Sequence, residues 1–348
     1  MRIGLFLAYW PWFTPEEQMS LASLGDELGL DSVWISEAWG QDAVSVLGRL
    51  TGTTERIALG SGLMQIPARQ PAATAMAAAS LDVLSGGRFR LGLGVSGPQV
   101  SEGWYGVPFA KPLARTREYV EIVRAALDRR PLEHAGAHWT IPLDAAHGGS
   151  GLGKPLKLLT RPVQERIPIY LGAIGPKSLE QVGAIADGWL PFLFSPEAPE
   201  LMMDPLRRGV QAAGRALDDI DIAPVVPLAV HENLAEARHQ VRPWLAFYLG
   251  AMGAKEKNFY VDVADRYGHG AAARECQEKM LAGDRVGAAM ALTDELIDAA
   301  CICTTPGGLD ARLAAYAGAG ATTLVAVPSG PDKAAAVRAL AAAGAGRA

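Results

Sequence analysis

Strand and helix patterns alternate along this chain from its first residues, and this alternation limits the possible folds more than any other feature. The sequence predicts eight short apolar strands, and a helical pattern follows each of them. Parallel strands joined by right-handed helical crossovers close into a (β/α)8 TIM barrel, so we expect residues 1–348 to form one such domain. The predicted strands are Ile3–Ala8, Ser32–Ser36, Ile57–Leu63, Phe89–Val95, Ile167–Ala173, Trp189–Phe194, Ile220–Val230 and Thr322–Val327.

Two insertions interrupt the alternation. Residues 129–166 are rich in glycine and proline, and a segment this long inside a compact domain is usually functional, so we expect a flexible lid. Residues from about 234 to 300 have helical patterns with many methionine and aromatic residues. A doubly wound open sheet is the alternative architecture. It would need a GxGxxG motif near the first strand, and the sequence has none there.

Composition excludes several functional classes. The net charge of −5 argues against a nucleic acid or an anionic membrane as the main partner. The chain has three cysteines, and the Cys301-x-Cys303 spacing fits neither a redox nor a zinc motif, so we expect reduced thiols and a cytoplasmic protein. The six histidines show no metal-ligand spacing, so we predict no metal. No apolar run approaches the length of a membrane span, and we expect MRIGLFLAYWPWF to be a first strand rather than a signal peptide.

The segment FRLGLGVSGPQVSEGWYGVP, residues 89–108, predicts one wall of a ligand pocket. Its strand is apolar on both faces, which is typical of a parallel strand covered on both sides. Gly92 and Gly94 near its carboxyl end allow close approach of the backbone to a bound group, and barrels of this kind bind ligands at that end. The alternative is a buried strand followed by an ordinary turn.

A second segment, residues 172–177, predicts an anion site. After the fifth predicted strand, Ala173, Ile174 and Gly175 present successive N–H groups where a helix begins at Pro176 and Lys177. Helix starts concentrate unpaired donors and positive partial charge, which suits a phosphate group. A plain strand-to-helix turn with proline at the first helical position is the alternative.

Several segments together resemble a known family. These are SGGRFRLGLGVSGPQVSEGWYGVPF from Ser85, LGAIGPKSL from Leu171 and ADGW from Ala186, with KPLARTREYVEIVR and AMGAKEKNF elsewhere in the chain. They resemble the bacterial luciferase-like superfamily, and most of all its branch that uses the deazaflavin coenzyme F420. The resemblance covers essentially the whole chain. It implies a (β/α)8 barrel, a cofactor across the carboxyl ends of the strands, hydride transfer at the deazaflavin C5, a small-molecule substrate and a homodimer.

The resemblance also implies which residues bind F420, which has a flat ring system, a ribityl phosphate and an anionic oligoglutamate tail. The Gly62–Leu63 bond matches the family position of a non-prolyl cis peptide behind the ring; an ordinary trans bulge is the alternative. The implied cofactor-binding residues are Glu37, Gly62, Leu63, Gln65, Gly94, Val95, Ser96, Gly97, Ala173, Ile174, Gly175, Pro176 and Lys177. A basic rim for the tail would combine Lys154, Lys157, Arg161 and Lys177, with Lys111 and Arg115 nearby, although such residues are often only solvated surface.

Candidate catalytic and substrate-binding residues lie at predicted strand ends. Glu37, Trp39 and Gln65 are the catalytic candidates, with Glu37 or a bound water handling the proton. The sugar-phosphate dehydrogenase branch carries a histidine directly after that acid, whereas this chain has Ala38, which argues against a sugar-phosphate substrate. An aromatic mouth suits a bulky apolar or conjugated substrate. The expected substrate residues are Tyr9, Trp10, Trp39 and Trp104.

These observations favour an F420-dependent oxidoreductase that reduces an activated C=C, C=N or C=O bond. An FMN-dependent monooxygenase on the same barrel is the nearest alternative. A non-catalytic flavin- or F420-binding barrel, with its mouth filled by the late insertion, is another. A hydrolase is disfavoured, because the sequence offers neither paired carboxylates nor metal-binding histidines at the strand ends.

Overall fold

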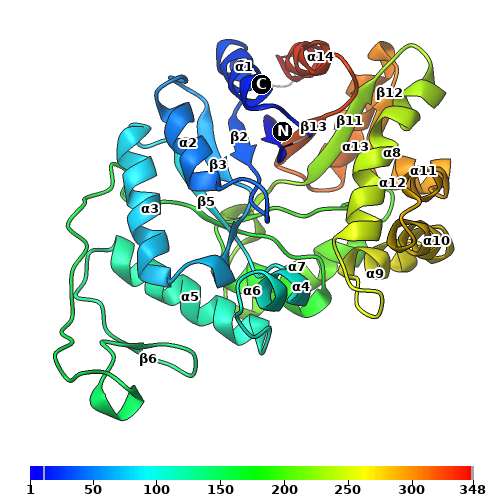
Figure 1. Ribbon diagram of the computed structural model, residues 1–348. Coiled ribbons are helices and arrows are strands. Elements are labelled where there is room, and N and C mark those ends of the chain that lie inside the picture. The colour runs from blue at the N-terminus through cyan, green and yellow to red at the C-terminus, as the bar shows by residue number, and fades with distance from the viewer. Residues whose placement is uncertain (11, 346–348) are drawn as a thin grey trace.

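Parallel β-strands form the centre of the computed structural model, which describes residues 1–10 and 12–345 (Figure 1). Hydrogen-bonded neighbours run in the order β10-β9-β8-β5-β3-β2-β1-β13-β11. Only Ala223 and Pro224 separate β10 from β11, so this path returns to its start and the sheet closes into the predicted barrel. The central strands are β1 (Arg2–Leu7), β2 (Ser32–Ile35), β3 (Ala58–Ser61), β5 (Phe89–Gly94), β8 (Ile169–Leu171), β9 (Gly188–Trp189), β10 (Asp221–Ile222), β11 (Val225–Val230) and β13 (Thr323–Pro328).

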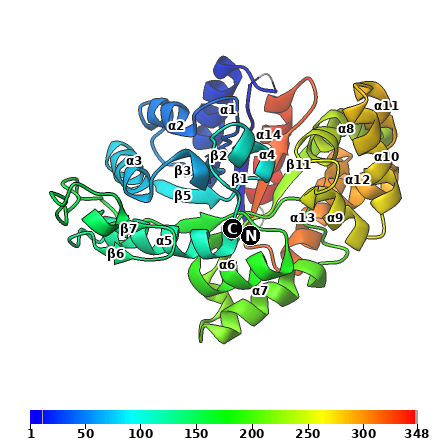
Figure 2. The same cartoon turned by 60° about the horizontal axis from the view of Figure 1, so that its bottom comes forward.

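Helices cover the outside of this barrel and connect successive strands, as both ribbon views show (Figures 1 and 2). The first of them begins with a capping box, in which the Thr14 side chain accepts a hydrogen bond from the Glu17 N–H while the Glu17 carboxylate accepts one from the Thr14 N–H. The outer helices are α1 (Pro15–Glu27), α2 (Ala43–Thr51), α3 (Pro71–Leu84), α5 (Pro112–Leu127), α6 (Pro176–Ile185), α7 (Glu200–Ala212), α13 (Leu309–Gly318) and α14 (Lys333–Ala345).

Large side chains fill the barrel interior. The rings of Trp34 and Tyr170 pack edge to face with their centroids 4.8 Å apart, and both residues are buried. Gly60 and Gly188 make room for them, because a Cβ atom at either glycine would overlap the Trp34 or the Tyr170 ring. The interior is therefore a packed core, and ligands are left with the ends of the strands.

The third predicted strand is split in the structure. β3 ends at Ser61, the Gly62–Leu63 peptide is cis, and a second short strand, β4 (Met64–Gln65), pairs with Leu93 and Gly94 of β5. The prediction of a cis bond at this position is confirmed. The seventh predicted strand is also divided, since Pro224 lies between β10 and β11 and has no N–H to donate.

The first insertion lies outside the barrel. It contains a small hairpin, β6 (His134–Ala135) and β7 (Thr140–Ile141), and it projects beyond α5 at the lower left of Figure 1. The Glu118 carboxylate on α5 accepts hydrogen bonds from the backbone N–H groups of Ala137, His138 and Trp139. The expected lid thus packs its hairpin against α5 and the residue before α3 rather than over the strand ends.

The second insertion is helical, as predicted, and forms a separate group at the right of Figure 1. Its first helix packs against β11, and the insertion ends in a short strand that also pairs with β11 and was not predicted. A further short helix, α4 (Pro98–Gly103), lies between β5 and α5. None of the described helices is long and apolar enough to cross a membrane. The elements of the insertion are α8 (Leu234–Ala251), α9 (Phe259–Arg266), α10 (Gly270–Leu281), α11 (Arg285–Met290), α12 (Asp294–Ala300) and β12 (Ile302–Thr304).

Candidate functional site

Leu63 connects the predicted site segments at the carboxyl ends of β5 and β8. These two strands are parallel neighbours, and the Gly172 N–H donates to the Leu93 carbonyl over 3.1 Å. A Cβ atom at Gly94 would lie 3.0 Å from Leu63 Cδ1, and one at Gly172 would overlap the same atom. A Cβ atom at Gly92 would overlap the Ser61 carbonyl oxygen and would also lie 2.9 Å from Leu63 Cδ2. These glycines admit the Leu63 side chain, a role that the sequence alone did not suggest.

Glu37 is buried just after β2, and both of its carboxylate oxygens have partners. Arg69 donates to both oxygens over 2.6 Å, while the N–H groups of Gln65 and Ala43 donate over 2.9 and 3.3 Å. Arg69 also pairs with Asp42. Burial lowers the pKa of the Arg69 guanidinium, but Glu37 and Asp42 outweigh that effect and raise it. This geometry ties the loops after β2 and β4 together, and it leaves Glu37 no free oxygen.

Two buried polar atoms at the same strand ends have no hydrogen-bond partner among the described residues. Gln65 donates through Nε2 to the Glu37 carbonyl over 3.1 Å, while its Oε1 is unpartnered. The Ser36 hydroxyl, at the end of β2, is also unpartnered. Leaving a buried polar atom unsatisfied costs about 1–3 kcal/mol, so such atoms in a native fold call for an external partner. Gln65 Oε1 suits a ligand that presents an N–H donor, as the imide edge of a flavin or deazaflavin ring does.

A row of free backbone donors lies beside this position, where β8 leads into α6. The N–H groups of Ala173, Ile174 and Gly175 have no acceptor among the described residues. Trp189 Nε1 donates to the Ala173 carbonyl over 3.0 Å and Arg266 donates to the Ile174 carbonyl over 2.7 Å. Because a trans peptide directs its C=O and N–H in opposite directions, these two bonds direct the next N–H groups away from Trp189 and Arg266.

The start of α6 extends this row of donors. Its N-cap, Gly175, supplies no side-chain cap, and Pro176 has no N–H. The next two N–H groups, of Lys177 and Ser178, lie in the first turn, where a helix has no internal acceptors. The residues therefore fit a phosphate group. Arg266, which comes from α9, holds the Ile174 carbonyl on the opposite side of this backbone, a contact that no local sequence pattern indicated.

The predicted aromatic residues divide into exposed and buried ones. Trp10, Trp39 and Trp104 are 44%, 42% and 64% exposed and are accessible to a ligand. Tyr9 is buried instead, with its hydroxyl oxygen 2.7 Å from that of Tyr248 on α8. Burial raises the pKa of Tyr9 to about 12, although the hydrogen bond to Tyr248 lowers it. Tyr9 belongs to an aromatic cluster that the insertion brings to the end of β1. The cluster comprises Tyr9, Trp12, Phe192, Trp244, Phe247, Tyr248 and Tyr260.

The structure separates two members of the predicted basic rim, Lys157 and Lys177. The carbonyls that flank Lys157 bond to Leu132 and Arg129, just beyond the carboxyl end of α5. Lys177 lies at the amino end of α6. Both helices run antiparallel to the strands that precede them, so these lysines lie toward opposite ends of the barrel. The prediction that Lys157 and Lys177 share one rim is wrong. The insertion that carries Lys157 starts from the carboxyl end of α5, which lies at the end of the barrel opposite to the site.

The geometry defines a (β/α)8 barrel with free polar groups at its mouth, and comparison with known proteins gives its family. The model of the luciferase-like monooxygenase family matches residues 1–323, and the chain belongs to this family. It is 42% identical over 328 residues to a predicted coenzyme F420-dependent oxidoreductase of Mycobacterium tuberculosis, covering 93% of this chain and 94% of the relative. It is 31% identical over 321 residues to the 5,10-methylenetetrahydromethanopterin reductase of Methanolobus tindarius, covering 91% and 92%.

A solved structure extends this likeness to the fold. The coenzyme F420-dependent tetrahydromethanopterin reductase of Methanopyrus kandleri superimposes with a TM-score of 0.83 at 26% identity, covering 98% of this chain and 97% of the other. The superposition covers both insertions as well as the barrel.

Proposed function

We propose that this protein is a coenzyme F420-dependent oxidoreductase acting on a small organic molecule. The observation that carries the proposal is the pairing of one unpartnered buried acceptor, Gln65 Oε1, with the free N–H row of residues 173–175. An imide edge and a phosphate group at opposite ends of one ligand match these two features. When bound, F420 supplies a hydride at its C5 position to an activated C=C, C=N or C=O bond of the substrate.

The site residues divide the work of binding and positioning. Gln65 accepts a hydrogen bond from the ring, and the backbone of residues 173–175 with Lys177 binds the phosphate. Gly62 and Leu63 pack behind the ring, while Gly94, Val95, Ser96 and Gly97 form its rim. Trp10, Trp39 and Trp104 contact the substrate, and Tyr9 supports them from the buried cluster.

Glu37 acts as a positioning residue in this scheme. Its carboxylate already receives Arg69 and two backbone N–H groups, so it holds Gln65 in place through the Gln65 N–H. A water molecule is then the better source of the proton that accompanies hydride transfer. Most of the catalytic contribution comes from placing donor and acceptor carbons in contact.

A titration of the purified protein separates F420 from the FMN of luciferase-like monooxygenases. We expect F420 to bind more tightly than FMN, measured by fluorescence, and tighter FMN binding would overturn the cofactor assignment. Single-turnover oxidation of reduced F420 with a panel of enones and imines then tests for an enzyme. Oxidation that no panel member accelerates would favour the non-catalytic barrel.

We further propose a cytoplasmic homodimer in which the chain acts as one domain. Apolar side chains are exposed on α3 and on the first insertion, including Met76 and Leu84 at 60% and 62% and Leu152 and Leu159 at 87% and 93%. A second copy would cover them. The three cysteines are buried free thiols, which suits a reducing compartment. Light scattering should show a dimer that the double variant Leu152→Ser, Leu159→Ser weakens; a monomeric wild type would contradict the proposal.

A further inference from the structure

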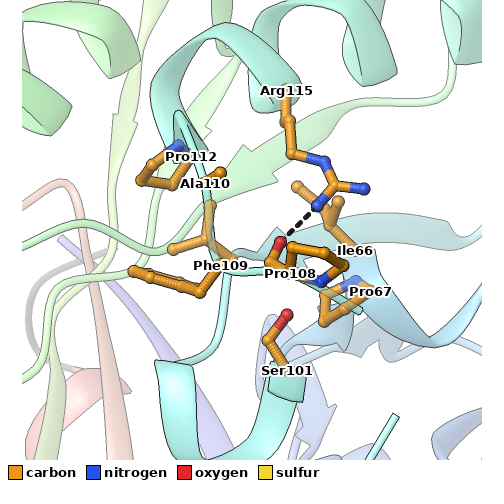
Figure 3. A pocket seen from close by; sticks show the side chains of 9 residues that line it. Ile66, Pro67, Ser101, Pro108, Phe109, Ala110, Pro112 and Arg115 are labelled. Carbon is orange, nitrogen blue, oxygen red and sulfur yellow. Dashed lines mark hydrogen bonds between the residues drawn. The ribbon is translucent and has the colours of Figure 1, made fainter. Parts of the chain in front are cut away.

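A hollow lies beside the candidate cofactor site, and Val95 is the one lining residue that the scheme above also assigns to the cofactor. It is shallow and opens to solvent. It lies between the loop after β4, the end of β5, the segment 98–110 and the start of α5, so it adjoins Gln65 and Gly94. Its lining is almost entirely apolar, as Figure 3 shows. The lining residues are Ile66, Pro67, Val95, Ser101, Pro108, Phe109, Ala110, Pro112 and Arg115.

Arg115 is the charged member of this lining. Figure 3 shows its guanidinium directed toward Pro108, Ile66 and Pro67, and one terminal nitrogen donates to the Pro108 carbonyl over 2.6 Å. Its Nε is buried and has no partner among the described residues. Arg115 also forms no ion pair with any described carboxylate. Glu118, one turn further along α5, is occupied by the backbone of the hairpin and by His134.

The guanidinium is held in place from outside. It lies 5.7 Å from the centre of the Trp139 ring, and Trp139 Nε1 donates to Gln70 Oε1 over 3.0 Å. Trp139 belongs to the first insertion and Gln70 directly precedes α3. The first insertion therefore orients Arg115 toward the hollow, although it does not cover the strand ends. A guanidinium that is already held in place loses little conformational freedom when a ligand binds, and this favours the binding of an anion.

The chemistry of the hollow limits what it can bind. The one other polar side chain in the lining, Ser101, already donates its hydroxyl to the Val107 carbonyl over 2.7 Å. Apolar walls with a single planar cation suit a group that is apolar over most of its surface and carries one carboxylate. A phosphate ester would leave most of its oxygens facing apolar side chains, which is costly.

We propose that this hollow binds the carboxylate-bearing apolar part of the substrate, with Arg115 as the partner of the carboxylate. The assignment to substrate rests on the proposed function, because it is F420 bound beside Gln65 that would place this group next to the reacting centre. The binding itself does not depend on F420, so the two claims can fail separately.

The test measures binding of benzoate and of benzamide to the full-length protein without cofactor, by calorimetry. We expect benzoate to bind at least tenfold more tightly than benzamide, because only benzoate pairs with the guanidinium. The variant Arg115→Met should abolish this preference. Arg117→Met, which removes an exposed arginine of the same helix, should retain it. Equal binding of the two probes, or a preference that survives in Arg115→Met, would overturn the proposal.

A second variant keeps the test decisive if Arg115→Met does not fold. Ala110→Leu leaves the arginine in place but narrows the hollow, so benzoate binding should fall at least tenfold there as well. Unchanged binding would place benzoate elsewhere and overturn the proposal. Inorganic phosphate that binds as tightly as benzoate would overturn the assignment to carboxylates. A parallel F420 titration tests the proposed function: benzoate binding without F420 binding supports the hollow and overturns its assignment to substrate.

Discussion

The two ends of the barrel are built from similar polar residues but treat them differently. At the amino ends of the strands, Arg90 pairs with Asp31 over 2.6 Å and Arg2 pairs with Asp221 over 2.8 Å. Asp221 also accepts hydrogen bonds from Tyr170 and Thr323. Burial raises the pKa of Asp31, but Arg90 and Arg2 outweigh it and hold the pKa below its ordinary value of 3.8.

At the carboxyl ends, by contrast, polar groups are left over. Glu37 and Arg69 satisfy each other, yet Gln65 Oε1 and Ser36 Oγ have no partner among the described residues. The N–H groups of residues 173–175 are also free. A polar group with all its partners in place stabilises the fold, whereas an unpartnered one is a cost that a ligand can remove. The difference indicates that the amino end supports stability and the carboxyl end supports binding.

The largest expected effect is at the amino end. Replacing Arg90 by Met leaves the half-buried Asp31 carboxylate without its main partner, so the free energy of unfolding should fall by about 2 kcal/mol. Urea unfolding measures this change, with Arg117→Met as the surface control. F420 affinity per folded molecule should stay within twofold of the wild type. If F420 affinity fell together with stability, the proposal that the amino end supports stability and the carboxyl end supports binding would be wrong.

Low pH should destabilise the fold through carboxylates at the amino ends of the strands. Burial raises the pKa of Asp187 as it does that of Asp31, but Arg124 and the Ile169 N–H outweigh burial, so both pKa values lie below 3.8. The unfolded chain therefore takes up protons first, so the stabilisation is complete above about pH 5 and is lost progressively as the pH falls through the folded-state values. Unfolding free energies should be equal at pH 7 and 5, slightly lower at pH 4 and clearly lower at pH 3. The unfolding free energy of the Asp31→Asn variant should fall less steeply as the pH is lowered. A slope identical to that of the wild type would show that Asp31 does not contribute to the acid sensitivity.

The carboxyl end should show the opposite balance. Replacing Gln65 by Leu removes the unpartnered Oε1, so F420 affinity should fall about tenfold, equivalent to about 1.4 kcal/mol. The free energy of unfolding should change by no more than about 1 kcal/mol, because a single hydrogen bond from Nε2 is lost. Fluorescence titration and urea unfolding measure the two quantities. Unchanged affinity would remove Gln65 from the cofactor site.

A matched pair of small substitutions gives the finest comparison. Ser36 and Thr323 are both buried hydroxyl residues, but Ser36 Oγ has no described partner while Thr323 Oγ1 donates to Asp221 over 2.8 Å. Thr323→Val should lower the free energy of unfolding by about 1 kcal/mol, because Asp221 loses a donor. Ser36→Ala should leave it unchanged or raise it slightly. Equal losses of unfolding free energy in both variants would show that hydroxyl groups at the two ends contribute equally to stability.

Much of the site could be predicted because its signals are local. Gly175 and Pro176 mark the start of α6 within a few residues of a strand, and the Gly62–Leu63 position follows from matching one short segment. Arg69 and Arg266 were missed, since each reaches its partner across the chain: Arg69 lies 32 residues from Glu37, and Arg266 lies 92 residues from Ile174. Arg69 lies four residues beyond Gln65, just after a strand end, and this position could have indicated a role at the site. No comparable signal marked Arg266.

The sequence alone determined the barrel and the direction in which it binds ligands. Strand periodicity, helix caps and proline positions act over a few residues, and parallel strands with right-handed crossovers leave few other topologies. Only the tertiary structure decided which polar groups find partners. It filled the spaces above Gly94 and Gly172 with Leu63, occupied Glu37 with Arg69, and turned the first insertion from an expected lid into a support for Arg115. These outcomes depend on packing between distant segments, and no local pattern of residues encodes that packing.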